Sequence, residues 1–347
     1  MKINKYPVIL AAVALAGAFS SCKNSDIEFP DYEGGVNVYF AHQYPVRTLV
    51  MGDDTYDTSD DNAHKCKIYA TMGGAYKGRD ITLDIAADQS LVEHLTFDGV
   101  APVKAMPESY YKLASNKIKF NGDHMGYVEV EFTDAFFADP DALANTYVVP
   151  LVIKSQKGAD GILAGTPNAE GNTPPRCKAD EWSVQPKDYV LYCVKYINKY
   201  DAEYATRGID VITENGTTTT VKRHEQYVEN DELRTVGTRD LSTAVYPVST
   251  VVSLPDGTKQ TLTCDLILSF GANDECTITS GTSGFTAAGS GKFVKDGEKK
   301  SWGNKDRNAL YLEYTVDFGV RRYETFDTLV VKSRNVAAEF FTPEYKN

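Results

Sequence analysis

The sequence predicts an all-β protein of two domains, a β-sandwich followed by an antiparallel β-barrel. Apolar and polar residues alternate with a period of two along much of the chain, and glycine-containing turn pairs separate the alternating runs. A length of 347 residues suits two domains of roughly 100–200 residues each better than one. Helical periodicity is scarce, so we expect only short helices.

Three segments show the alternation most clearly. Every second residue from Leu310 to Phe318 is apolar, and the same pattern occurs from Leu262 to Phe270 and, more briefly, from Val128 to Phe132. One face of each of these strands is therefore expected to lie in a core. Turn pairs that accept positive φ angles fall between such runs, at Asn121-Gly122, Asn215-Gly216, Asp256-Gly257 and Asp296-Gly297.

A composition change near the middle of the chain separates the two predicted domains. Residues 157–188 are rich in Gly, Pro, Asn and charge and lack a sustained period, which is typical of a long connector. Before it, residues 36–156 hold short strands at the spacing of a sandwich. After it, residues 189–347 hold longer strands joined by hairpins, as in an up-and-down barrel. Short helices or turns are expected at 135–144 and 202–205.

The N-terminus has the features of a lipoprotein signal peptide. Two lysines precede an apolar run (Pro7 to Phe19) that is too short to span a bilayer as a mature helix, and two serines lead directly to Cys22. This order predicts a signal peptide over residues 1–21 and lipid attachment at Cys22, the alternative being an ordinary secretory signal with a chance cysteine. Residues 22–35 are then a polar tether, and the acyl chains hold the protein at a membrane.

Net charge restricts the partners. The chain carries a formal charge of −12, so nucleic acid and anionic lipid are not expected to bind, because both would be repelled. No second apolar stretch approaches the length of a membrane span, so the body is not expected to cross the bilayer. The 22 tyrosines suit strands and also surfaces that bind polar ligands, so their abundance does not separate fold from function.

Motifs for catalysis and for metal binding are not evident. The chain has no HExxH helix, GxSxG elbow or Walker loop. The segment Gly289-Ser290-Gly291-Lys292 looks like a phosphate loop, but Phe293 stands where Ser or Thr belongs, and a β-turn is the preferred interpretation. The acidic loop at residues 53–62 lacks the spacing and the glycine of an EF-hand, so a solvated loop is expected rather than a calcium site. We therefore predict no enzyme activity, no metal site and no cofactor.

The cysteines other than Cys22 are expected to be mostly buried, unpaired thiols. Their number is odd, so at least one cannot pair within the chain, and one disulfide is possible in an exported protein. No CxxC spacing occurs, so structural zinc is not expected. The residues concerned are Cys66, Cys177, Cys193, Cys264 and Cys276.

Several short segments carry a family resemblance. In the N-terminal half they are VYF at 38–40, PVRTL at 45–49, YKL at 111–113, IKF at 118–120, GYVEV at 126–130 and YVVPLVI at 147–153. In this order they resemble the Bacteroidetes surface-lipoprotein module called domain of unknown function 1735. In the C-terminal half, the segments at 289–294, 310–318 and 327–331 resemble the barrel module that accompanies it in some relatives.

The resemblance implies an immunoglobulin-like sandwich followed by a calycin- or lipocalin-like barrel. It also implies a place beside outer-membrane glycan importers. Some relatives with this N-terminal module carry a glycosidase or lectin-like domain instead of this C-terminal half, so the resemblance indicates a setting more than an activity. The barrel interior is expected to be filled by side chains, with a cavity for an apolar ligand as the alternative.

Candidate ligand-binding residues were chosen for saccharide chemistry. Sugars stack their apolar C–H faces on aromatic rings, while their hydroxyls exchange hydrogen bonds with Asn, Asp and Arg. A polar hairpin loop around Trp302 has this mixture, although Trp302 could instead cap the barrel, and Trp182 in the connector could instead pack at a domain interface. Tyr110 precedes a strand, next to a second tyrosine, so one of the two rings is expected to face solvent. The candidates are Trp302, Asn304, Asp306, Arg307, Trp182 and Tyr110.

Together these features predict a lipoprotein of the outer membrane that faces the cell exterior. We expect it to bind glycans, without catalysis, as an accessory of a polysaccharide uptake system whose importer proteins are its neighbours. The alternative is a structural or assembly accessory that contacts an outer-membrane protein. A glycoside hydrolase is the third possibility, and no pair of carboxylates in the sequence is singled out for it.

Overall fold

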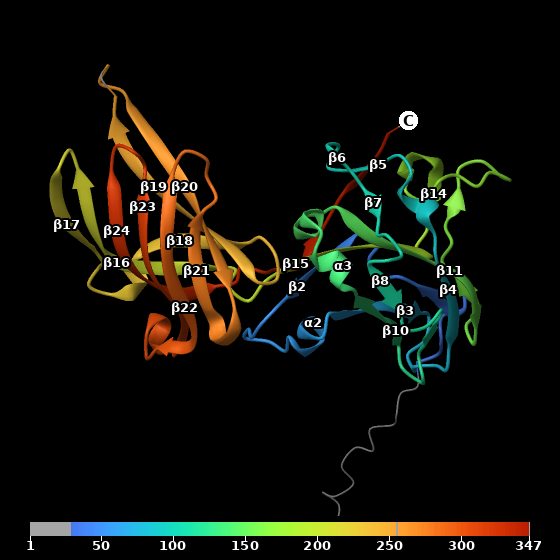
Figure 1. The fold of residues 1–347 in the computed structure, drawn as a ribbon. Coiled ribbons are helices and arrows are strands. Elements are labelled where there is room, and N and C mark those ends of the chain that lie inside the picture. Colours follow the sequence, from blue (N-terminus) through green and yellow to red (C-terminus); the bar gives the residue numbers. More distant parts are fainter. Residues whose placement is uncertain (1–28, 255, 347) are drawn as a thin grey trace, which may run out of the picture.

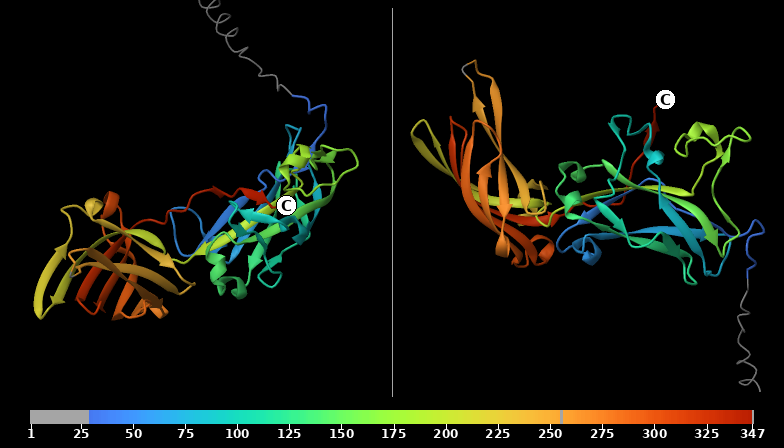
Figure 2. Two further views of the ribbon diagram at one scale, coloured as in Figure 1. Left: turned by 90° about the horizontal axis from the view of Figure 1, so that it is seen from above. Right: turned by 45° about the vertical axis from the view of Figure 1, so that its right-hand side comes forward.

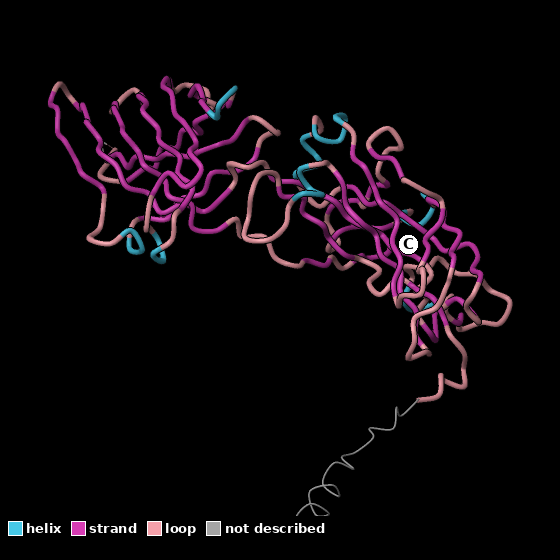
Figure 3. Tube along the Cα trace, turned by 90° about the horizontal axis from the view of Figure 1, so that it is seen from below, coloured by secondary structure: helices cyan, strands magenta, loops and turns pink. Residues whose placement is uncertain are grey.

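The structure is a computed structural model that describes residues 29–254 and 256–346 (Figure 1). It confirms an all-β fold with two domains, which form an elongated, bent molecule (Figures 2 and 3). The described chain begins at the outer end of the N-terminal domain, and the barrel forms the opposite end of the molecule. The C-terminus returns to the N-terminal domain.

The N-terminal domain is built on one strongly bent sheet. Its strands, in spatial order, are β12 (Gly161–Ile162), β1 (Asn37–Tyr39), β3 (Lys65–Gly73), β10 (Met125–Phe132), β9 (Lys117–Lys119), β4 (Thr82–Ala87), β11 (Tyr147–Lys157), β15 (Tyr189–Ile197), β2 (Pro45–Val50) and β25 (Glu339–Phe340). Two short strands pair off this path, β7 (Lys104–Ala105) with β11 and β8 (Tyr111–Leu113) with β10. Most neighbours are antiparallel, whereas β1–β12, β11–β7 and β15–β2 are parallel.

The two halves of this sheet close on a common core. Alternate residues of β3 and β10, such as Ile68 and Val130, meet residues of β11 and β15, such as Leu151 and Val194. All four are buried, so the sheet forms the two layers that the predicted sandwich requires. The remaining elements of the domain are α2 (Ser59–Asn62), α3 (Asp134–Phe137), η1 (Gln89–Val92), η2 (Pro140–Leu143), η3 (Ala179–Glu181), β5 (Leu95–Phe97), β6 (Ala101–Pro102), β13 (Thr166–Pro167), β14 (Trp182–Val184) and β26 (Pro343–Tyr345).

The C-terminal domain is a closed antiparallel barrel of eight strands. They follow each other in the order β16 (Ala202–Glu214), β18 (Glu232–Thr238), β19 (Thr243–Ser253), β20 (Lys259–Phe270), β21 (Glu275–Ser280), β22 (Thr286–Glu298), β23 (Arg307–Asp317) and β24 (Arg322–Ser333). Pairing of β24 with β16 closes the barrel. Strand β17 (Thr217–Arg223) adds a hairpin to the outer part of β16, and the short helices η4 (Val228–Asn230), η5 (Ala272–Asp274) and η6 (Trp302–Asn304) lie in loops.

Side chains fill the barrel interior, as predicted. Aromatic and aliphatic residues form a core that includes Tyr204, Leu266 and Phe270. A charged cluster is buried beside this core: the Arg223 guanidinium pairs with the carboxylates of Asp210 and Asp327. Ion pairing with Arg223 offsets part of the cost of burying the two carboxylates.

Strand β15 belongs to the N-terminal sheet, which differs from the predicted barrel domain of residues 189–347. Its residues pair with both β11 and β2. Its sequence, YVLYCVKYI, is an almost continuous apolar run that does not identify its neighbours, and only pairing assigns a strand to a sheet. The barrel strands therefore start at Ala202, and the tail after Ser333 returns to the N-terminal domain, where β25 pairs with β2 and β26 pairs with β5.

Arg334 links the two domains at this junction. Its Nη1 donates to the carbonyl oxygen of Met51 (3.2 Å) and its Nη2 to that of Asn198 (2.6 Å). Asn198 is fully buried, and its amide Nδ2 donates to two carbonyl oxygens of the barrel, those of Asp240 and Thr243. The connection between the domains is therefore fixed by hydrogen bonds on both sides.

Local predictions had mixed outcomes. The short helices expected at 135–144 are present as α3 and η2, but residues 202–205 begin strand β16, because pairing with two neighbouring strands outweighs weak helical propensity. Asn215-Gly216 forms the expected two-residue hairpin. Asp296-Gly297 lies instead at an irregularity within β22. The five cysteines in the described part of the chain are all buried and form no disulfide.

Candidate functional site

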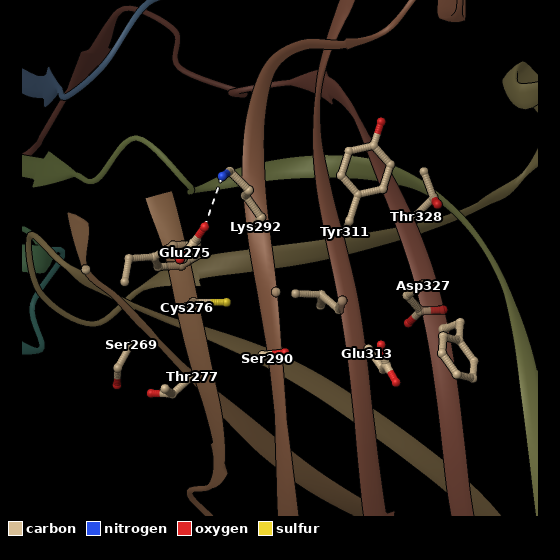
Figure 4. A pocket seen from close by; sticks show the side chains of 15 residues that line it. Ser269, Glu275, Cys276, Thr277, Ser290, Lys292, Tyr311, Glu313, Asp327 and Thr328 are labelled. Carbon is tan, nitrogen blue, oxygen red and sulfur yellow. Dashed lines mark hydrogen bonds and ion pairs between the residues drawn. The ribbon is translucent and has the colours of Figure 1, made fainter. Parts of the chain in front are cut away.

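A hollow lies on the outer wall of the barrel, across β20 to β24. We call this hollow, of about 840 Å³, the trough (Figure 4). Strand register places outward-facing side chains from different strands in two parallel rows. The first row consists of Ser269, Thr277, Ser290, Glu313 and Phe326, and the second of Glu275, Lys292, Tyr311 and Thr328.

Two glycines explain why the wall is hollow at β22. Gly289 and Gly291 alternate with outward-facing Ser290, so this strand presents no large side chain on either face there. A Cβ on Gly291 would lie 2.5 Å from Leu312 Cδ2 and 3.0 Å from Cys276 Sγ, so only glycine allows this close approach. The segment predicted as a β-turn is therefore the middle of a strand, and it forms the floor of the trough.

Phe326 is the aromatic surface of the trough. Its side chain is 51% exposed, although it lies in the middle of β24, and it pairs across the ladder with Glu313. An apolar ring held open to solvent on a rigid sheet is available for stacking. A smaller hollow of about 280 Å³ continues past Phe326 along Thr315 and Glu324, so the trough is open at this end.

Polar groups line the rest of the trough. Lys292 pairs with Glu275 (3.0 Å), and the Tyr311 hydroxyl donates to Glu298 (2.9 Å). Burial, together with this bond to Glu298, raises the pKa of Tyr311 to about 12, so its hydroxyl remains protonated at neutral pH. The trough thus combines an aromatic surface with hydroxyl, carboxylate and ammonium groups.

A second hollow separates the two domains. This interdomain cleft, of about 700 Å³, is lined on one side by the acidic loop at residues 53–59 and on the other by the barrel ends, including Asp306 and Arg307. Lys295 of the barrel pairs with Asp53 across it. In the described ranges, 29–254 and 256–346, no group of three or more His, Cys, Asp or Glu side chains is arranged to hold a metal ion.

The predicted site around Trp302 is only partly assembled. The Arg307 guanidinium lies 4.6 Å from the centre of the Trp302 ring and donates to the Trp302 carbonyl oxygen, so the ring is covered on that face and half-buried. Asp306 accepts hydrogen bonds from Lys299 and from the backbone of Lys300. Asn304 lines a different shallow hollow beside Glu229.

Trp182 and Tyr110 lie in the N-terminal domain, away from the barrel (Figure 1). The Trp182 indole donates to the carbonyl oxygen of Pro175 (3.0 Å), which stabilises the connector. Tyr110 donates to Asp139 (3.0 Å) and packs edge-on against Tyr147. The structure therefore brings Asp306 and Arg307 to one cleft but does not bring the six predicted residues into one site, and Cys22 lies outside the described residues.

Sequence reasoning missed the trough because its rows depend on register. Tyr311 and Glu313 were recognised only as the polar face of an alternating strand. The available signal was Phe326, a large aromatic residue flanked by Thr325 and Asp327, both of which are buried. An aromatic residue that alternates out of phase with the buried residues of its strand indicates an exposed ring.

Family comparisons match both domains. The model described as domain of unknown function DUF5627 matches residues 199–335, and a model described only as an N-terminal domain matches residues 31–160. A crystal structure of a protein of unknown function from Bacteroides ovatus is 40% identical, covers 91% of this chain and 100% of its own, and superposes with a TM-score of 0.84. Residues 199–335 therefore form a DUF5627 domain, and the whole chain belongs to the same family as this Bacteroides ovatus protein. Neither family description names domain of unknown function 1735.

This assignment gives the fold a solved relative and leaves the activity open. A second Bacteroides ovatus structure, from strain ATCC 8483, is described as a candidate carbohydrate-binding protein; it covers 87% of this chain and 99% of its own at 10% identity, with a TM-score of only 0.26. No curated protein matches the chain. The DUF5627 description names no enzymatic activity. Among the described residues, no helix is both long and apolar enough to span a membrane.

Proposed function

We propose that this protein binds glycan chains in the trough of its DUF5627 domain and does not cleave them. The half-exposed ring of Phe326 at the end of a row of polar side chains is the observation that carries the proposal. A sugar ring stacks its C–H face on such an aromatic ring, and its hydroxyls can bond to Ser290, Glu313 and Tyr311. Because the trough is open, a polymer can lie across it without its end entering a pocket.

The charges of the trough indicate the class of glycan. Glu275 and Lys292 neutralise each other, whereas Glu313 and, beside Phe326, Glu324 add negative charge. Anionic polymers such as uronate-containing or sulfated glycans would be repelled. Neutral polysaccharides, and those with amino groups, are therefore the expected ligands.

The cellular setting of the proposal comes from the N-terminus. Lipid attachment at Cys22 would place the protein on the outer membrane, facing the exterior, where it would hold glycans for the importer proteins of an uptake system. The barrel lies at the end of the molecule opposite to the start of the described chain, so the trough would be held away from the anchor (Figure 1).

Retention on immobilised polysaccharides tests the proposal. We expect a neutral or amino polysaccharide to retain the protein, and Phe326→Ala to weaken retention about tenfold, or ~1.4 kcal/mol. Tyr227→Ala is the matched control, because Tyr227 lies in the barrel domain outside the trough and is similarly exposed (59%, against 51% for Phe326). If the folded protein bound none of the immobilised polysaccharides, or if both variants lost retention equally, the trough would be refuted as the site. Release of reducing ends from a polysaccharide would refute the absence of cleavage.

A further inference from the structure

Exposed aromatic and apolar side chains gather at the end of the N-terminal domain where the described chain begins. Five of them are about half exposed or more, between 48% and 66%. We call these five the tether-end patch: Phe29, Tyr69, Tyr76, Met125 and Tyr127.

Cross-strand register and ring contacts make this patch continuous. Tyr69 of β3 and Tyr127 of β10 stand directly opposite each other, with ring centres 5.3 Å apart. Met125 lies on the same face of β10, two residues before Tyr127. The neighbouring His124 ring bonds to the carbonyl oxygen of Tyr76 (3.1 Å), and the Tyr76 ring lies 5.1 Å from that of Phe29.

Charged groups border the patch: two lysines are paired with carboxylates, and Lys119 of β9 stands directly opposite Tyr127. Lys67 lies over the Tyr127 ring and pairs with Asp60 (2.6 Å), and Lys65 pairs with Glu129 (2.8 Å). The patch itself is therefore aromatic and apolar, and charged side chains lie at its border. Tyrosine and methionine beside paired charges suit the boundary between water and lipid headgroups, where an apolar ring can be buried while its hydroxyl stays hydrated.

We propose that the tether-end patch rests on the headgroup surface of the membrane to which the chain is anchored. The length of the tether carries the argument. Only six residues, 23–28, lie between Cys22 and Phe29. The seven Cα–Cα steps from Cys22 to Phe29 span at most roughly 25 Å when fully extended. A lipid on Cys22 therefore keeps Phe29, at one end of the patch, within this distance of the bilayer, and contact buries five exposed aromatic and apolar side chains.

The patch then sets the orientation of the whole body. The barrel lies at the far end of the bent molecule (Figures 1 and 2). Contact at the patch therefore gives the trough one orientation relative to the membrane, which attachment through the tether alone would not do. The net charge of −12 makes an uncharged or zwitterionic lipid surface the fitting occupant, because anionic lipid repels the body. This inference rests on the lipid attachment that is part of the proposed function, but not on glycan binding.

Site-specific fluorescence on the full-length, lipidated protein in phosphatidylcholine vesicles tests it. A Met125→Cys variant carries an environment-sensitive label in the patch, and Thr219→Cys carries the same label on exposed strand β17 of the barrel. The other described cysteines are buried and should not react. We expect nitroxide-bearing lipids to quench the label at residue 125 several-fold more strongly than the label at residue 219. The additional changes Tyr69→Ser and Tyr127→Ser should reduce this difference.

Equal, weak quenching at both positions would overturn the inference. Shielding of residue 125 in cells but not in pure lipid vesicles would also overturn it, because the patch would then be covered by a protein partner. Mass spectrometry of the same sample detects acyl chains on Cys22. Their absence would overturn the anchor and this inference together, and glycan retention, measured separately, would be unaffected by that result.

Discussion

Gly291 and Leu312 stand opposite each other on β22 and β23, and a Cβ at position 291 would lie 2.5 Å from Leu312 Cδ2. This close approach is part of the floor of the trough. It couples the stability of the barrel to the shape of the candidate site, because a larger residue would have to push β22 outward.

Gly291→Val should therefore destabilise the barrel by about 1–3 kcal/mol and weaken glycan retention at the same time. Ser290→Ala, one residue away but facing outward, is the control and should leave the free energy of unfolding nearly unchanged. Urea unfolding of the two variants measures this difference. If Gly291→Val matched the native stability, the close packing of β22 would not shape the trough.

The buried charges of the barrel give a second prediction. The side chain of Asp327 is fully buried, pairs with Arg223 and accepts a hydrogen bond from the Tyr314 hydroxyl (3.1 Å). Burial, with the nearby charge of Asp327, raises the pKa of Tyr314 well above 10, so this hydroxyl stays a donor. Asp327→Asn removes one of the two carboxylates that pair with Arg223, and it should lower the free energy of unfolding by about 3 kcal/mol. Glu324→Gln, on the exposed face of the same strand, should cost little.

The returning C-terminal tail gives a third prediction. Phe341 is 6% exposed and packs against Phe97 (ring centres 4.8 Å apart) in a small core of the N-terminal domain, whereas its neighbour Phe340 is 56% exposed. Phe341→Ala should lower the free energy of unfolding by about 3 kcal/mol, and Phe340→Ala should lower it much less. Each domain contains one tryptophan, Trp182 or Trp302, so single-tryptophan variants report which domain unfolds earlier. If Phe341→Ala destabilised only the barrel, the assignment of the tail to the N-terminal domain would be wrong.

Acid should loosen the same tail. Burial acts to raise the pKa of Glu339, but hydrogen bonds from Lys195 and Asn145, each 2.7 Å, outweigh it and hold this pKa below 4.5. A carboxylate with a lowered folded pKa stabilises the fold above its unfolded pKa and loses this contribution as the pH falls through the folded value. The difference in unfolding free energy between the native protein and Glu339→Gln should therefore be constant near neutral pH and shrink below about pH 4.5. A difference that grew on acidification would contradict this account.

Much of the fold was predictable because it depends on local patterns. The alternation from Leu310 to Phe318 indicated a strand with one buried face, and the Asn215-Gly216 pair indicated a hairpin. The same reasoning placed β15 in the barrel, because a strand's own sequence does not say which neighbours it pairs with. The candidate site was predicted less well, since proximity in sequence grouped Trp302 with Asn304, Asp306 and Arg307, whereas the loop turns these side chains toward different hollows.

By itself, the sequence determined the all-β class, the division into two domains, the acidic charge that excludes polyanions, and the expectation of a lipid on Cys22. Each of these follows from composition or from residues within a few positions of one another. Tertiary structure alone decided the rows of the trough and the exposure of Phe326. It also decided that Tyr69 meets Tyr127, because the register of one strand against another is set by the packing of the whole sheet.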